Sequence, residues 1–386
     1  MLRVPVQPNL LNWALQRSGY TVDSFAETYP DTKIAAWIAG TIQPTLKQLE
    51  KFATRTRAPI GYFFLPEPPE EPVPIPDFRT IADRAVATPS PDLLDTIYLC
   101  QQRQEWFREY ARAERLSPVE AIGSVDRRTD PVVVARQIRE TLNFSLQERR
   151  TMGTWTEALR RFIEQVEDAG ILVMISGVVG SNNTRTLDTA EFRGFALADP
   201  FAPLIFINGA DTKSAQMFTL AHELAHLWLG QTALSDASAR NEPDQETELW
   251  CNRVAAELLV PLEAVREQYR ATDEVTEEIK RLARVFKVST LVVLRRIYDA
   301  GFFSRDIYWA VYDAELARLR QLAAERPGGG GNFYYTTVSR VSRRFAQAII
   351  GSTLEGRASF TEALRLLGFK KMTTFNDLGR AVGVDI

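Results

Sequence analysis

The sequence predicts a mainly α-helical protein with one small β-sheet, an α+β fold. Along most of its 386 residues, apolar side chains recur every three to four positions, which is the spacing of amphipathic helices. Three short β-rich runs interrupt this pattern, at residues 171–179, 192–197 and 204–207. A run between residues 66 and 76 is too rich in proline for either helix or strand. These observations predict several domains joined by a linker.

Composition is that of a folded protein. A chain of this length exceeds the usual size of one hydrophobic core, and its 45% apolar and 25% charged residues are ordinary. No apolar run approaches the length of a membrane span, and residues 1–30 lack the pattern of a signal peptide. Cys100 and Cys251 lie far apart and outside any Cys-x-x-Cys pattern, which argues against a disulfide framework. We therefore expect a cytoplasmic protein that makes no membrane contact.

The first expected domain, residues 1–66, is a bundle of four short helices. Thr21 or Asp23 can cap the second helix, and the pair Pro44-Thr45 introduces the fourth. Helices this short must pack on one another to be stable. Residues 67–77 form a stiff proline-rich linker.

The remaining chain is expected to form three further regions. A helical spacer covers 78–150, an α+β domain with the three β-rich runs covers 151–300, and a helical region covers 301–386. The expected helices are 91–115 and 131–143 in the spacer, 154–169, 213–229, 247–259 and 278–300 in the domain, and 306–326, 333–356, 360–368 and 374–382 beyond it.

The pentapeptide His222-Glu223-Leu224-Ala225-His226 carries the clearest chemical signal. On an α-helix, positions four apart lie one above the other, so His222 and His226 project their imidazoles toward a single point. Two neutral imidazoles, a third protein ligand and a water form a catalytic zinc site. Glu223 lies beside that point and is the candidate general base. These are the only two histidines of the chain, and chance rarely produces this arrangement.

The third ligand must be Asp, Glu or Cys, because no histidine remains. The downstream candidates are Asp236, Glu242, Asp244, Glu246, Glu248, Cys251 and Glu257. Glu248 is the best placed, because it shares a helix face with Asn252, whose side chain can accept a hydrogen bond from a ligand histidine. In the alternative interpretation, Glu246 and Glu248 belong to a solvated helix face.

Two strings resemble the ImmA/IrrE family of zinc-dependent peptidases. They are FTLAHELAHLWLG at 218–230 and ELWCNRVAAELLVP at 248–261, and the resemblance covers at least residues 150–300. It implies that zinc is held by His222, His226 and Glu248, with Glu223 as the base.

The same resemblance implies a compact zincin-like metallopeptidase core. In such a core, the strand at 192–197 or at 204–207 would lie along the cleft. An extended substrate could then pair with it as an added edge strand.

Residues 1–66 resemble an Xre-type helix-turn-helix, with WxxG at 37–40 followed by PTLxxL at 44–49. The resemblance implies that the third helix faces a DNA major groove, with polar contacts from Lys33, Thr41 and Gln43. The net charge of −3 excludes a general attraction to nucleic acid, but residues 1–60 hold seven Lys and Arg against four Asp and Glu. Alternatively, this bundle binds only a protein partner.

Two functions of different classes remain open. The first is a zinc-dependent endopeptidase, with gated activity, that acts on a regulatory protein such as a repressor. The second is a DNA-binding antitoxin or transcriptional regulator that pairs with a toxin, binds operator DNA through residues 1–66 and carries a structural zinc. Glu223 favours the enzyme, because a purely structural zinc needs no base and more often has four protein ligands.

Overall fold

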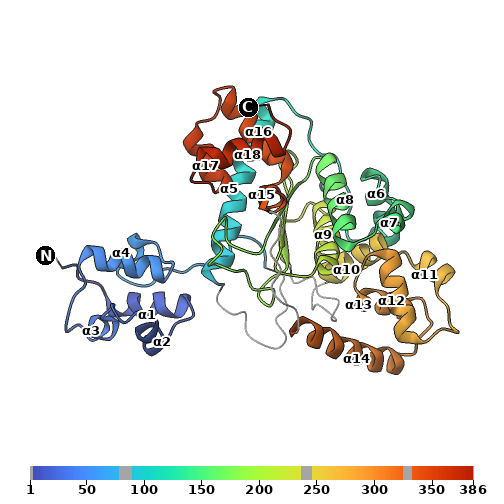
Figure 1. The fold of residues 1–386 in the computed structure, drawn as a ribbon, viewed down its shortest axis with the longest axis horizontal. Coiled ribbons are helices and arrows are strands. Elements are labelled where there is room, and N and C mark those ends of the chain that lie inside the picture. The colour runs from blue at the N-terminus through green and yellow to red at the C-terminus, as the bar shows by residue number, and fades with distance from the viewer. Residues whose placement is uncertain (1–2, 78–88, 236–245, 325–332, 386) are drawn as a thin grey trace. The chain divides into compact units, whose positions relative to one another are not determined.

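A computed structural model describes residues 3–77, 89–235, 246–324 and 333–385 (Figure 1). Its many helices and its small sheet confirm the predicted α+β class. The chain divides into two compact units, each considered by itself below. The N-terminal unit comprises Met1–Pro74 and Ile81–Ile97, and the second unit comprises Ile75–Thr80 and Tyr98–Ile386.

The N-terminal unit is a bundle of short helices around an aromatic core. Its elements are α1 (Pro8–Arg17), α2 (Val22–Thr28), α3 (Ile34–Ile38), α4 (Leu46–Arg55) and the 3-10 helix η1 (Ile60–Phe64), and α5 (Pro91–Ala113) begins in it. Thr21 caps α2 and Thr45 caps α4, each by accepting a hydrogen bond from the amide three residues further on. Phe25 and Phe52 are fully buried, with ring centroids 5.3 Å apart. This core holds together helices that are individually too short to be stable.

Four strands form the sheet of the second unit, among the residues that the structure describes. They are β1 (Leu172–Ser176), β2 (Gly194–Leu197), β3 (Leu204–Asn208) and β4 (Ala233–Ser235). The strand order is β1-β3-β2-β4, with β1 parallel to β3 and β2 antiparallel to both of its neighbours. Every strand residue is buried, which explains why the strands are continuous apolar runs without alternation.

This strand order corrects the expectation of a free edge at 192–197 or 204–207. These runs correspond to β2 and β3, and each has a neighbouring strand on both sides. Neither can therefore accept an added substrate strand. The edge beyond β2 belongs to β4, which the sequence did not predict because three residues are too few to show a periodic pattern.

Helices lie on both sides of the sheet. α8 (Trp155–Asp168) and α9 (Lys213–Trp228) pack on one side, and α15 (Phe333–Val341) and α16 (Arg343–Leu354) contact β1 from the other (Figure 1). Val173 and Ile175 of β1 join the hydrophobic cluster that contains the buried side chains of α8 and α9. α10 (Glu246–Leu259) packs against α9, so α9 is enclosed between the sheet and another helix.

The other helices of the second unit surround this core. They are α6 (Pro131–Thr141), α7 (Leu146–Thr151), α11 (Leu262–Gln268), α12 (Val275–Phe286), α13 (Thr290–Asp299), α14 (Arg305–Ala324), α17 (Phe360–Leu367) and α18 (Met372–Ala381). None of the helices in the described parts of the chain is long and apolar enough to cross a bilayer.

Two segments that were expected to form single helices each form two. The segment 278–300 falls in α12 and α13, because Lys287 adopts a left-handed conformation (φ 53°) and Ser289 then caps α13. The segment 333–356 falls in α15 and α16, which are separated at Ser342 (φ 69°), the N-cap of α16.

Candidate metal centre

The candidate centre is built on α9, a helix buried along most of its length. The Thr212 side chain caps its first turn by accepting a hydrogen bond from the Ala215 amide. Every side chain from Gln216 to Trp228 is buried, because α9 lies between the sheet and α10. His222 and His226 are one turn apart on this helix and have no exposed surface.

Glu248, in the first turn of α10, completes a group of three buried side chains with the two histidines. Its Oε2 lies 3.1 Å from Nε2 of His222, and its Oε1 lies 3.0 Å from Nε2 of His226. The two imidazole Nε2 atoms are 3.1 Å apart. The structure thus brings together the three side chains that the resemblance implied as ligands.

The spacing of these atoms fits a metal ion. Ligand atoms about 2.0–2.1 Å from a tetrahedral zinc ion lie roughly 3.3 Å from one another. The two Nε2 atoms and the Glu248 oxygens approach this separation, at 3.0 to 3.1 Å. Three mutually facing acceptor atoms are unfavourable in a buried site unless a cation lies between them.

The electrostatics of the three side chains are strongly coupled. Burial by itself would raise the pKa of Glu248, but the two adjacent imidazoles outweigh it and hold that pKa well below its usual range. Burial lowers the pKa of His226. At His222, burial is outweighed mainly by Glu248, and the pKa is raised. One carboxylate and two imidazoles are a donor set that suits a divalent cation such as zinc.

Asn252 lies one turn after Glu248 on α10, against the back of His222. Its Oδ1 is 3.0 Å from Nδ1 of His222. Because an amide oxygen only accepts hydrogen bonds, this contact places a proton on Nδ1, so that the neutral form of His222 has Nε2 free to bind a metal ion. Asn252 therefore fixes the ring orientation of His222, a candidate ligand.

Glu223 lies beside this group and is fully buried. Burial is the main reason why its pKa is raised to about 8, although His222 acts in the opposite direction. Among the described residues, neither carboxylate oxygen of Glu223 has a hydrogen-bond partner of good geometry. A buried carboxyl group with no such partner is costly to stability and is typical of a functional site.

Gly194, the first residue of β2, allows Glu223 to lie close to the sheet. A Cβ atom at this position would be 2.6 Å from Cγ2 of Thr219, 2.9 Å from the Phe206 carbonyl oxygen and 3.2 Å from Oε1 of Glu223. A larger residue would therefore displace α9 or the Glu223 side chain.

Sequence reasoning missed both Gly194 and Ser235 as members of this site. Ser235 ends β4, is fully buried, and has its Oγ 3.3 Å from Nε2 of His226. A glycine at the start of a β-rich run is a signal that could have identified Gly194. No comparable signal marks Ser235, because its position depends on the pairing of β4 with β2.

The other candidates for the third ligand do not lie with the two histidines. Glu246 is exposed and pairs with Arg127, while Glu257 is buried and pairs with Arg296. Cys251 is buried as a free thiol, and burial raises its pKa well above the usual range. Asp236, Glu242 and Asp244 lie outside the described residues.

The region that builds this centre resembles a known peptidase family. Residues 166–298 match the IrrE N-terminal-like domain, Peptidase_M78. The match covers about a third of the chain and contains every residue of the centre. It supports the predicted ImmA/IrrE resemblance for this segment, and with it a peptidase-like function. Residues 341–381 match a domain of unknown function, DUF8813. No curated protein matches the chain.

The predicted DNA contacts lie around α3 in the N-terminal unit. Lys33 is exposed and directly precedes the helix. Thr41 is exposed and its hydroxyl donates to the Ala36 carbonyl at 3.0 Å. Oε1 of Gln43 accepts a hydrogen bond from the Val6 amide at 3.2 Å. Two of the three side chains thus also stabilise the local fold.

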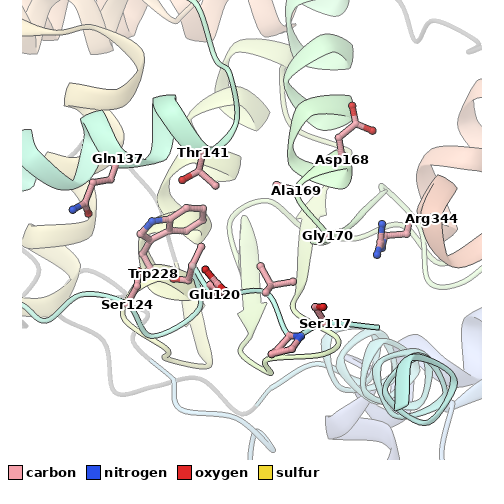
Figure 2. A pocket seen from close by; sticks show the side chains of 13 residues that line it. Ser117, Glu120, Ser124, Gln137, Thr141, Asp168, Ala169, Gly170, Trp228 and Arg344 are labelled. Atoms are coloured by element: carbon pink, nitrogen blue, oxygen red, sulfur yellow. Dashed lines mark hydrogen bonds between the residues drawn. The ribbon is translucent and has the colours of Figure 1, made fainter. Parts of the chain in front are cut away.

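A separate hollow of about 640 Å³ lies at the C-terminal end of α9 (Figure 2). Figure 2 shows Trp228 of α9 and Arg344 of α16 at opposite sides of it. Several residues of the segment 117–124 also line it, and Gly123 of that segment donates to the Leu227 carbonyl at 3.0 Å. None of the three candidate ligands lines this hollow, so it is distinct from the metal centre.

Proposed function

We propose that the chain is a zinc-dependent endopeptidase that cleaves a regulatory protein, such as a repressor. The observation that carries the proposal is the buried group of His222, His226 and Glu248, with atoms 3.0 to 3.1 Å apart, next to the buried Glu223. The resemblance of residues 166–298 to a peptidase family supports it.

The residues of the centre have separable roles in this proposal. His222, His226 and Glu248 would hold the zinc ion, which would supply a Lewis acid for the reaction. Glu223 accepts the proton of the attacking water and delivers it to the leaving amide nitrogen. Asn252 holds the ring of His222 in the orientation that presents Nε2 to the metal.

The test compares the wild-type chain with Glu223→Gln and Glu248→Gln. Zinc content is measured by mass spectrometry, and loss of a co-expressed candidate regulator is followed in cells. We expect Glu223→Gln to keep about one zinc per chain and to lower the cleavage rate about 100- to 10,000-fold, the usual contribution of a general base. Glu248→Gln should lose the zinc as well.

Two results would contradict the proposal. The first is that Glu223→Gln and the wild type both bind zinc and act identically on the regulator. The second is that Glu248→Gln retains stoichiometric zinc, which would remove Glu248 from the ligand set.

A further inference from the structure

The outer edge of β4 is occupied by a short piece of the chain's own proline-rich linker. Asp77 forms a parallel bridge with Leu234, and the Leu234 amide donates to the Pro76 carbonyl at 2.9 Å. Ile75 is 7% exposed and is therefore anchored in the core. Residues 75–77 thus lie against the sheet as an additional edge segment.

The domain assignment places this piece in the second unit. Ile75–Thr80 belongs to the second unit, whereas the chain on both sides of it, Met1–Pro74 and Ile81–Ile97, belongs to the N-terminal unit. The bridge between Asp77 and Leu234 therefore lies within the second unit.

β4 places this edge next to the metal centre. Ser235 follows Leu234, pairs with Gly194 of β2, and has its Oγ 3.3 Å from Nε2 of His226. A chain paired with the outer edge of β4 lies about 4.8 Å, one strand spacing, from the β4 backbone. Any extended peptide added at this edge would run beside the centre.

We propose that residues 75–77 are a displaceable strand that fills this edge in cis, and that an extended peptide substrate must replace them to reach the metal centre. The proposal rests on the proposed peptidase function and deepens it. The substrate it implies is a flexible protein segment in extended conformation, recognised through its main chain by strand addition.

Proline makes the resident segment a weak strand. Pro76 accepts a hydrogen bond from Leu234 but has no N–H to donate in return, and Pro74 also lacks one. A competing peptide with an N–H at the Pro76 position can make a hydrogen bond that the linker cannot. The buried Ile75 side chain is one anchor of the segment.

The first experiment detaches that anchor in the full-length chain with Ile75→Ser. The matched control is Val73→Ser, the same kind of change two residues earlier in the linker. Hydrogen exchange of the Leu234 amide and binding of a labelled synthetic peptide of residues 71–77 are measured in both. We expect hydrogen exchange of the Leu234 amide to be at least tenfold faster in Ile75→Ser than in the wild type, and the Ile75→Ser chain to bind the peptide. Val73→Ser should behave like the wild type in both measurements. Unchanged exchange and no peptide binding in a folded Ile75→Ser chain would overturn the proposal.

The second experiment joins residue 77 to residue 234 by a disulfide in the double variant Asp77→Cys and Leu234→Cys. This variant keeps Ile75, so it tests whether the segment must leave the edge even if Ile75→Ser does not fold. The bridged residues lie on adjacent strands, within reach of a disulfide, and the native Cys100 and Cys251 are buried. Cleavage of reduced, alkylated casein should fall at least tenfold on oxidation and recover with a phosphine reductant. Equal cleavage by the oxidised and reduced forms would overturn the proposal.

The Glu223→Gln chain separates a failure of the proposed peptidase function from a failure of the proposed role of residues 75–77. Absence of any Glu223-dependent cleavage, in every variant, contradicts the proposed peptidase function. Exchange at Leu234 and peptide binding do not depend on catalysis, and they still decide whether residues 75–77 leave the edge. A segment that detaches without changing Glu223-dependent cleavage contradicts its role as a competitor of substrate.

Discussion

The two compact units differ in one buried feature, a group of histidine and glutamate side chains that, among the described residues, lies in the second unit. The hydrophobic cluster of the N-terminal unit consists of aliphatic and aromatic residues, and the Phe52 ring contacts the rings of both Phe25 and Trp37. The second unit has a similar apolar cluster, but it also buries two histidines and two glutamates together at one point. Its core therefore contains groups that reduce stability unless they are hydrogen bonded or bind a cation.

This difference separates polar residues that stabilise the fold from polar residues to which we assign the proposed chemistry. In the N-terminal unit, the polar side chains of Thr21 and Thr45 cap helices, and Gln43 holds the Val6 amide. In the second unit, Glu223 is buried without a good hydrogen-bond partner among the described residues. The costly burial of polar groups is the reason why we place the proposed chemistry in the second unit.

The largest expected effect tests whether the two cores are independent. Phe52→Ala removes a fully buried ring from the N-terminal core and should lower the free energy of unfolding of that unit by about 3–5 kcal/mol. Zinc binding should be unchanged, because the metal centre lies in the other core. The matched variant Phe162→Ala removes a fully buried ring of α8 and should destabilise the second unit instead. Calorimetry with zinc titration checks both; loss of zinc in a folded Phe52→Ala chain would show that the cores are coupled.

A second prediction concerns Glu167, a buried carboxyl group at the end of α8. It accepts hydrogen bonds from the Ser342 hydroxyl and the Arg343 amide, yet burial raises its pKa from 4.5 to about 7. The folded state thus binds this proton more tightly than the unfolded state. The stabilisation is complete below pH 4.5 and is lost as the pH rises to about 7, a change of roughly 3 kcal/mol.

Denaturant unfolding between pH 4.5 and 7.5 checks this prediction. Glu167→Gln should flatten the fall in stability over that range, whereas Asp168→Asn, at the exposed neighbouring position, should not. The same slope in the wild type and in Glu167→Gln would show that other groups cause the pH dependence.

Local sequence patterns were sufficient for much of the fold and for part of the centre. The positions of His222, Glu223 and His226 follow from helical spacing alone, and the four-residue spacing of a helix turn places Asn252 beside Glu248. Apolar periodicity located most helices, and β-rich runs located three strands. All of these features depend on residues close together in the sequence.

The missing features depend on pairing between distant segments. β4 is too short to be periodic, so the sequence could not predict that Ser235 reaches His226 or that residues 75–77 reach Leu234. For the same reason the edge was assigned wrongly to β2 or β3, which are internal strands. The left-handed residue Lys287 also divides a segment whose apolar pattern is continuous.

A smaller effect is expected at Asn252, which supports a candidate ligand without being one. Asn252→Ala removes the acceptor of the His222 Nδ1 proton and should weaken zinc binding about 10- to 100-fold. Asn252→Asp keeps an acceptor and should bind zinc far better than the alanine variant. The exposed neighbour Arg253 provides the control Arg253→Ala. Competition with a zinc chelator measures all three; equal affinity of Asn252→Ala and wild type would show that Asn252 does not orient His222.

The smallest expected effect tests the surface of the N-terminal unit, where the sequence predicts operator DNA as a partner. If Lys33 contacts a phosphate, Lys33→Ala should weaken binding by a similar factor for every DNA sequence and lower the slope of log affinity against log salt by about 0.9. Lys51→Ala is the matched control, because the Lys51 ammonium already pairs with Asp31 at 2.9 Å. Gel shifts of the full-length chain on its own upstream region, at several salt concentrations, measure both slopes. Equal slopes for Lys33→Ala and the wild type would exclude Lys33 as a phosphate contact. Absence of any salt-sensitive complex would leave the N-terminal unit as a protein-binding module, with chemistry confined to the unit that buries charge.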